Sequence, residues 1–246
     1  MTSHSWTFLA VCAAVLITSG ARADWFTEVE SGAAINSLND VRIPGDSGTR
    51  FSLTRDLSVD PVPYVRIRLG TTVARRHTVF ALYAPLRFLA HGTVDRTISF
   101  AGETFPANTP LRASYTFNSY RLTYRYRLVD SKDVEFDFGA TAKVRDAAIT
   151  LDGPTYAEKT DVGFVPLLSF RVAYHMSPSW DLLLDGDALA APQGRAEDAL
   201  LAGCLRLSDH SRVIGGYRIL EGGADNDEVY TFALIHYIVL GLSVTL

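Results

Sequence analysis

The sequence predicts an all-β protein, an antiparallel transmembrane β-barrel of about ten strands, within a range of about eight to twelve. Three observations predict this fold. Long segments alternate strictly between apolar and polar residues, no segment has a convincing helical period, and the breaks between segments alternate between short and longer. These patterns exclude βαβ folds and helix bundles.

The clearest alternation lies between residues 120 and 143. Residues 120–128 read Tyr-Arg-Leu-Thr-Tyr-Arg-Tyr-Arg-Leu, so the aromatic and aliphatic side chains share one face and the arginines share the other. After a polar break at 130–133, residues 134–143 repeat the scheme with Glu135 and Asp137 on the polar face. Strict alternation over this length is a strand signal, and the short polar break is typical of a hairpin turn.

The same pattern extends along the rest of the chain and divides it into successive strands. Strands rich in Val, Ile, Tyr, Phe and Trp are bounded by clusters of Gly, Pro, Asp and Ser. The predicted strands lie near 24–36, 61–73, 77–92, 112–129, 134–150, 162–176, 180–191, 196–207, 212–222 and 228–246.

The connections between these strands alternate in length. Short breaks are predicted at 74–76, 130–133, 177–179 and 208–211, and the other connections at 37–60, 93–111, 151–161, 192–195 and 223–227. A transmembrane barrel has tight periplasmic turns at one rim and larger extracellular loops at the other. The alternation therefore predicts a membrane barrel with both termini on the periplasmic side.

The beginning of the chain has the features of a secretory signal. The apolar run at 7–18 is shorter than the roughly 20 residues that a membrane-spanning helix needs, and it is followed by Ala21-Arg22-Ala23, a small-x-small cleavage pattern. We therefore expect a signal peptide at 1–23 and an outer-membrane β-barrel at 24–246. Cys204 is then the only thiol of the mature chain, so no internal disulfide is expected.

The charged residues are unusual in kind rather than in number. The formal net charge is −4, which gives no general attraction to nucleic acid, so no nucleic-acid partner is expected. All basic side chains except Lys132, Lys143 and Lys159 are arginines. Arginine makes several planar hydrogen bonds and suits buried ion pairs better than lysine does. This preference predicts charges that are enclosed by the fold.

Aromatic placement indicates which face of the barrel points outward. An aromatic girdle at the membrane interface is expected at the strand ends nearest the periplasmic turns, from Trp25, Tyr126, Phe136, Tyr174 and Trp180. The charges then face the lumen, where they form either a network of ion pairs that fills a narrow interior or a charged pore. The predicted lumen network contains Arg121, Arg125, Arg127, Glu135, Asp137, Lys143, Arg171, Asp185 and Asp187, and the same parity adds Glu28, Glu30, Arg66, Arg68, Arg87, Arg145, Arg206 and Arg218.

The end of the chain and several internal stretches carry a family resemblance. Residues 238–246 alternate up to the terminal Leu246 and resemble the closing strand of bacterial outer-membrane barrels. Residues 39–53, 117–127, 140–146 and 220–230 look similar to a group of uncharacterised outer-membrane proteins. The resemblance implies a bacterial outer-membrane location, contact with outer-membrane lipids and lipopolysaccharide, and passage through the barrel-assembly machinery. It supplies no catalytic residues.

The sequence leaves three functions open. The first is a structural or narrow-pore barrel with no catalytic residues, no metal and no cofactor. The second is a barrel enzyme acting on lipid A or peptides, for which Asp185, Asp187, His91 and His236 are the candidates, whereas His175 and Ser177 fall in a periplasmic turn. The third is a soluble periplasmic barrel that binds a small apolar ligand, in which the apolar faces would point inward.

Overall fold

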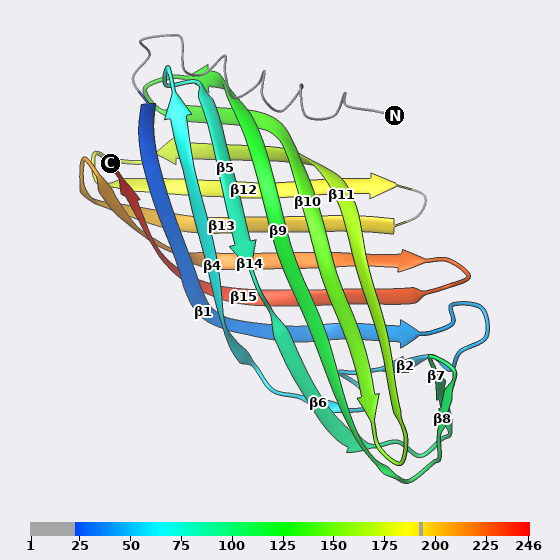
Figure 1. Ribbon diagram of the computed structural model, residues 1–246. Coiled ribbons are helices and arrows are strands. Elements are labelled where there is room, and N and C mark those ends of the chain that lie inside the picture. The colour runs from blue at the N-terminus through cyan, green and yellow to red at the C-terminus, as the bar shows by residue number, and fades with distance from the viewer. Residues whose placement is uncertain (1–22, 192–193) are drawn as a thin grey trace, which may run out of the picture.

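The chain folds as a closed antiparallel barrel of ten strands, which confirms the predicted fold class (Figure 1). The computed structural model describes residues 23–191 and 194–246, so the predicted signal peptide, apart from Ala23, lies outside the described residues. Within these ranges no helix is long and apolar enough to cross a membrane. The wall consists of β1 (Ala23–Arg42), β4 (Val62–Val73), β5 (His77–Ala84) continued by β6 (Arg87–Thr93), β9 (Pro110–Asp130), β10 (Val134–Asp152), β11 (Tyr156–His175), β12 (Trp180–Ala191), β13 (Gly194–Ser208), β14 (Ser211–Asp225) and β15 (Tyr230–Thr245).

The first strand closes the barrel, because β1 pairs with the last strand on one side and with β4 on the other. The ladder to β15 runs from Phe26 opposite Thr245 to Arg42 opposite Tyr230. The ladder to β4 is shorter and ends at Ala34. Each wall strand is antiparallel to both neighbours, and β5 and β6 count as one wall position because both pair with β9.

The two ends of the barrel differ in their connections. One end, which we call the turn end, holds the start of β1, the end of β15 and the short connections at 74–76, 131–133, 176–179 and 209–210. The opposite end, which we call the loop end, carries the longer segments 43–61 and 94–109. Both chain ends of the barrel therefore lie at the turn end, as the alternation predicts.

Two predicted connections at the loop end are wrong. The segment 151–161 is strand for most of its length, since β10 reaches Asp152 and β11 begins at Tyr156. In the same way β14 continues to Asp225, so the connection at 223–227 is shorter than expected. Polar residues interrupt the apolar pattern here, but the backbone ladder continues through them, from Thr150 opposite Glu158 to Asp152 opposite Tyr156.

A bulge in β1 reverses the alternation of its side chains. The register against β15 skips Ser37, so this residue is the extra one in the ladder. Ala34 and Asn36 are buried before the bulge, whereas Asn39 and Val41 are buried after it. The buried parity therefore changes from even to odd numbers, and the side chain of Ser37 lies exposed on the outer wall.

The segments 43–61 and 94–109 form a cap over the loop end. Within the cap, β2 (Phe51–Ser52) pairs with β1, β3 (Ser58–Val59) pairs with β6, and β7 (Ile98–Phe100) and β8 (Glu103–Phe105) form a separate hairpin. The two segments are joined where the Phe51 and Phe100 rings meet edge to face at 5.8 Å and where the Ala101 N–H donates to the Ile43 carbonyl at 2.9 Å.

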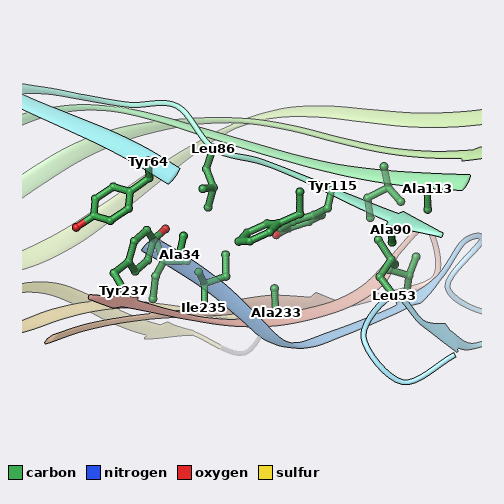
Figure 2. Close-up of a cluster of buried hydrophobic side chains, with 14 of the residues drawn as sticks. Ala34, Leu53, Tyr64, Leu86, Ala90, Ala113, Tyr115, Ala233, Ile235 and Tyr237 are labelled. Carbon is green, nitrogen blue, oxygen red and sulfur yellow. The ribbon is translucent and has the colours of Figure 1, made fainter. Parts of the chain in front are cut away.

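Apolar side chains fill the interior beneath the cap. Figure 2 shows Leu86 and Tyr115 on one side of this core and Ile235 on the other, all of them buried. Tyr64 and Tyr237 cross from opposite sides, with their rings edge to face at 4.8 Å. The half of the interior nearest the loop end is therefore packed like an ordinary hydrophobic core.

The outer wall is apolar over the middle of the barrel. Leu122, Ile238 and Leu240 are exposed there, with Leu240 at 66 % of its full accessibility. A barrel in water would bury such residues inside and expose the charges, whereas this chain does the reverse around its middle. The observed parity thus supports the membrane assignment over the soluble barrel.

We expect a charge on the apolar outer wall to destabilise the protein in lipid. Replacing Leu240 by Arg should lower the free energy of unfolding in vesicles by about 2–4 kcal/mol, because Leu240 lies near the middle of the apolar band. Denaturant titration followed by tryptophan fluorescence measures the change. Lys132→Glu, in an exposed turn, is the control and should have little effect; equal stability of Leu240→Arg and wild type would contradict a lipid-facing wall.

An ion pair inside the cap makes its stability depend on pH. Asp56 accepts hydrogen bonds from Arg96 at 2.7 Å and from the Ser52 N–H at 2.8 Å. Partial burial alone would raise the pKa of Asp56, but Arg96 and the Ser52 N–H outweigh burial and hold the pKa below its ordinary value. A lowered pKa stabilises the fold above the ordinary value and loses this contribution as the pH falls through the folded value.

Acidification should therefore loosen the cap. We expect faster hydrogen–deuterium exchange in residues 94–109 as the pH falls from about 5 to about 3, after correction for the intrinsic exchange rate. Asp56→Asn should speed exchange at pH 7 by an amount equivalent to about 0.2–1 kcal/mol, since the pair is partly exposed. The same variant should remove most of the pH dependence, and an unchanged pH dependence would rule out Asp56 as its source.

Candidate functional site

A layer of charged side chains crosses the interior between the apolar core and the turn end. Strand alternation points these residues inward, and each has a buried side chain. The layer contains as many carboxylates as arginines, so its formal charges cancel. Its members are Arg66 and Arg68 of β4, Arg121 and Arg125 of β9, Arg218 of β14, Glu28 and Glu30 of β1, Asp185 and Asp187 of β12, and Asp198 of β13. We call this set the charge layer.

Asp198 joins three walls of the barrel. Its carboxylate accepts hydrogen bonds from Arg218 at 2.5 Å, from Arg121 at 2.7 Å and from Arg66 at 2.9 Å. Arg218 belongs to the neighbouring strand, but β4 and β9 each lie four positions away from β13 in the strand order. Asp198 is therefore held by side chains that reach across the lumen.

Asp185 makes the widest crossing. It accepts hydrogen bonds from Arg68 at 2.7 Å and from Arg125 at 2.6 Å. The strands of Asp185 and Arg68, β12 and β4, are five positions apart in a ring of ten, which makes them opposite walls. Arg68 also donates to Glu28 on its neighbouring strand at 2.8 Å. Ion pairs thus connect opposite walls and adjacent ones in a single network.

A second charged tier lies nearer the turn end. Arg127 donates to Asp137 at 2.8 Å and to Glu135 at 3.0 Å, and Arg171 lies 3.1 Å from Glu135 and 3.4 Å from Asp137. These four residues sit on the adjacent strands β9, β10 and β11, so their pairs run along the wall. Arg127, Glu135 and Arg171 are more exposed than the charge layer, whereas Asp137 is as buried.

Of the three lumen arginines of β9, one has a carboxylate opposite it on β10 and two do not. Arg127 lies opposite Asp137 in the ladder, whereas Arg125 lies opposite Gly139 and Arg121 opposite Lys143. With no carboxylate on the neighbouring strand, Arg125 and Arg121 extend across the lumen to β12 and β13 instead. Sequence alternation gives the face of a residue but not the partner beyond the adjacent strand.

Lys143 is buried with a different kind of neighbour. Its ammonium lies 4.9 Å from the centre of the Phe117 ring, a cation–π contact, and no ion pair of Lys143 is found among the described residues. The guanidinium of Arg121 on the neighbouring strand takes Asp187 and Asp198. Lys143 therefore lies inside, as predicted, but outside the hydrogen-bonded network.

Some residues of the expected lumen set lie elsewhere. Arg87 is exposed, and Arg145 pairs with the exposed Asp161 near the loop end. Arg206 lies at the turn end, where it and His175 both bind Asp181. At these positions the strands reach the barrel rims, where inward parity no longer means burial.

Asp198 is the member of the charge layer that sequence reasoning missed. It follows Glu197, and two adjacent acids give no indication by themselves of which one points inward. The parity of its own strand carries the signal, because Leu200, Ala202 and Cys204 are all buried on the same face as Asp198. Extending that parity to the start of the strand would have identified it.

A cavity of about 510 Å³ lies between the charge layer and the turn end. Arg68, Arg125 and Asp185 of the charge layer line its inner end, and the turn residues 208–211 line its outer end. The second tier, Asp181 and Arg206 form its sides. Water and small ions therefore have a polar chamber at one end of the lumen that stops at the charge layer.

The predicted girdle residues all lie near the turn end. Trp25, Tyr174 and Trp180 are exposed, while Tyr126 and Phe136 are half-buried. Their role at a membrane interface remains a prediction. Within the described ranges, no three His, Cys, Asp or Glu side chains come together in a group that could hold a metal ion.

Comparison with known proteins identifies the fold but no sequence relative. No protein-family model and no curated protein matches the chain. Among solved structures, the chain is similar to the outer membrane protease OmpT from Escherichia coli, with a TM-score of 0.56 and 8 % identity over 94 % of this chain and 100 % of that one.

Two further solved structures have lower scores. Ail, the attachment invasion locus protein of Yersinia pestis, gives a TM-score of 0.43 at 8 % identity over 90 % of this chain and 99 % of that one. Neisserial surface protein A gives 0.34 at 10 % identity over 92 % of this chain and 99 % of that one. Of the three, the OmpT comparison alone exceeds 0.5, and it confirms the fold of an outer-membrane β-barrel without indicating an activity.

Removing one arginine from the charge layer should destabilise the barrel strongly. Arg218→Met leaves Glu30 without its shortest ion pair and Asp198 with one donor fewer. We expect a loss of about 3–5 kcal/mol in the free energy of unfolding, because an uncompensated charge stays buried. Adding Glu30→Gln should restore part of it. The control Arg145→Met breaks a more exposed pair and should cost less than about 1 kcal/mol by denaturant titration.

Proposed function

We propose that this protein is a structural barrel of the bacterial outer membrane whose lumen is closed to ions and solutes. The observation that carries the proposal is the charge layer, in which Asp185 and Asp198 are bound by arginines that reach across the lumen from distant strands. In the outer membrane, the turn end would face the periplasm and the loop end would face the cell exterior. The protein then differs from a porin, whose lumen is a water-filled channel.

Two successive barriers support a closed lumen. The charge layer ties the walls together, and opening it would expose or strand buried charges at a cost of about 3–5 kcal/mol for each broken pair. Beyond it, the core under the cap is lined mostly by apolar side chains, which makes ion entry costly. A barrel of ten strands is only slightly wider than the eight-stranded kind that side chains fill.

The geometry gives less support to peptide chemistry inside the barrel. Asp185 and Asp187, the candidate carboxylates, are each hydrogen-bonded to arginine at 2.6–2.7 Å. A carboxylate held in this way is a poor general base, because its oxygens already accept charge-assisted hydrogen bonds and are not free to take a proton from a substrate. His91, the third candidate, lies on β6 and has no shared contact with either aspartate.

The first test is electrical. Protein refolded into planar lipid bilayers should give no steady ion conductance above that of the bare bilayer at neutral pH, whereas a sixteen-stranded porin reconstituted in the same way should conduct. Heat-modifiable migration on unboiled gels verifies that the inserted protein is folded. Stable single-channel steps from folded protein would contradict the proposal.

A second test locates the barrier by thiol labelling. In a Cys204→Ser background, one cysteine replaces Thr245, which lines the cavity, and another replaces Ala113, which is buried in the apolar core. A charged, membrane-impermeant thiol reagent added on the periplasmic side should label the Thr245→Cys protein and leave the Ala113→Cys protein unlabelled. Labelling of both proteins from that side would show that the lumen is open beyond the charge layer.

A further inference from the structure

A hydrogen-bonded chain of Ser37, His236 and Tyr217 lies on the outer wall of the barrel. The Ser37 hydroxyl is 2.7 Å from His236 Nε2, and His236 Nδ1 is hydrogen-bonded to the Tyr217 hydroxyl. The Tyr217 and His236 rings stack with their centres 5.9 Å apart. The three residues come from the adjacent strands β1, β15 and β14, which run side by side in Figure 1.

The serine lies at the bulge in β1. His236 lies opposite Ile35 in the ladder, so a regular strand would put residue 37 opposite Leu234. Ser37 is the extra residue, and its side chain lies on the outer face, as those of Ser31 and Ile35 do. Its hydroxyl also lies 3.2 Å from the Leu234 carbonyl, so two acceptors are available for one proton. Bulges often re-aim a side chain beside an active site.

Ser37, His236 and Tyr217 lie at the height of the barrel where the outer edge of the membrane is expected. Ser37 is twelve residues beyond Trp25 on β1, which corresponds to roughly 30 Å of height for a tilted strand. The apolar band of such a barrel is about 25 Å tall. Toward the turn end, Ile238 and Leu240 are exposed and apolar, while toward the loop end Arg195 pairs with Glu221.

This arrangement has the parts of an acyl-transfer site. A serine hydroxyl within hydrogen-bond reach of an imidazole, which is itself held by a third group, is the common plan of nucleophilic hydrolases. With Nδ1–H donating to the Tyr217 oxygen, Nε2 is free to accept the proton of Ser37. Between Ile35 and Asn39, no strand of the described chain pairs with β1 on its β4 side. We place the donors for an oxyanion on that open backbone edge.

We propose that Ser37 and His236 are catalytic residues, with Tyr217 as a positioning residue, in a site that hydrolyses acyl esters of lipids in the outer leaflet. The acyl chain would lie along the apolar wall of Ile238 and Leu240, and the polar headgroup would lie beside Arg195. This inference goes beyond the proposed structural role and does not depend on whether the lumen is open.

The reaction balances with water as the only co-reactant. Ser37 Oγ attacks the ester carbonyl carbon while its proton moves to His236 Nε2. The C–O bond to the alcohol then breaks, and His236 returns the proton to the leaving oxygen, which leaves an acyl-serine. Water attacks this ester with its proton passing to His236, and the proton returns to Ser37 as the fatty acid leaves.

The test uses the full mature barrel refolded into vesicles, with folding verified by heat-modifiable migration. One vesicle type contains bacterial glycerophospholipids alone, and the other also contains lipopolysaccharide, so released acyl chains analysed by mass spectrometry distinguish the two ester sources. A fluorophosphonate probe reports the reactive serine through peptide mapping. The variants are Ser37→Ala, His236→Asn and Tyr217→Phe. The matched control is Ser31→Ala, a second exposed serine on the outer wall of β1.

We expect wild type and Ser31→Ala to release fatty acid from at least one vesicle type and to be labelled on Ser37. Folded Ser37→Ala and His236→Asn should release fatty acid at least about 100-fold more slowly than wild type. Tyr217→Phe should retain partial activity with a lower kcat and an unchanged KM, since the imidazole loses the hydroxyl that orients it. The proposal would be overturned if wild type released fatty acid no faster than Ser37→Ala in both vesicle types. It would also be overturned if the probe labelled a residue other than Ser37.

Discussion

The pairing of arginine with carboxylate across the lumen is the constraint around which the barrel is organised. Asp198 and Asp185 each draw guanidinium groups from strands that are distant in the ring. An isolated charge at this depth would cost several kcal/mol, so each member requires the others in place. Arginine suits this role because one guanidinium donates to two partners, as Arg121 does to Asp187 and Asp198.

This constraint divides the interior into unlike halves. On the side of the turn end, a polar cavity extends from the charge layer to the barrel rim. On the side of the loop end, Tyr64, Tyr115 and their neighbours pack as an apolar core beneath the cap. The division explains why a charged lumen need not be a pore. The charges act as a crosslink between walls, and the apolar core removes any continuous polar path through the barrel.

If the lumen is closed, other molecules can contact the protein only at the outer wall, the cap and the turn end. The outer wall is apolar in its middle. Toward the loop end it carries the hydrogen-bonded residues Ser37, His236 and Tyr217. A histidine that faces lipid needs partners for both ring nitrogens, and here both partners come from neighbouring strands. The bulge at Ser37 shows that the wall departs from regular pairing at the point where this chemistry is assembled.

The sequence by itself determined the fold class, the ten wall strands and the face on which most charges lie, because period-two alternation directly reports the two sides of a strand. It also put Arg127 and Asp137 on the polar faces of consecutive strands. Only the tertiary structure decided that Arg68 meets Asp185, that Asp198 is central, and that Ser37 reaches His236. Those contacts depend on barrel closure and on the register between strands, and neither leaves a local pattern in the chain.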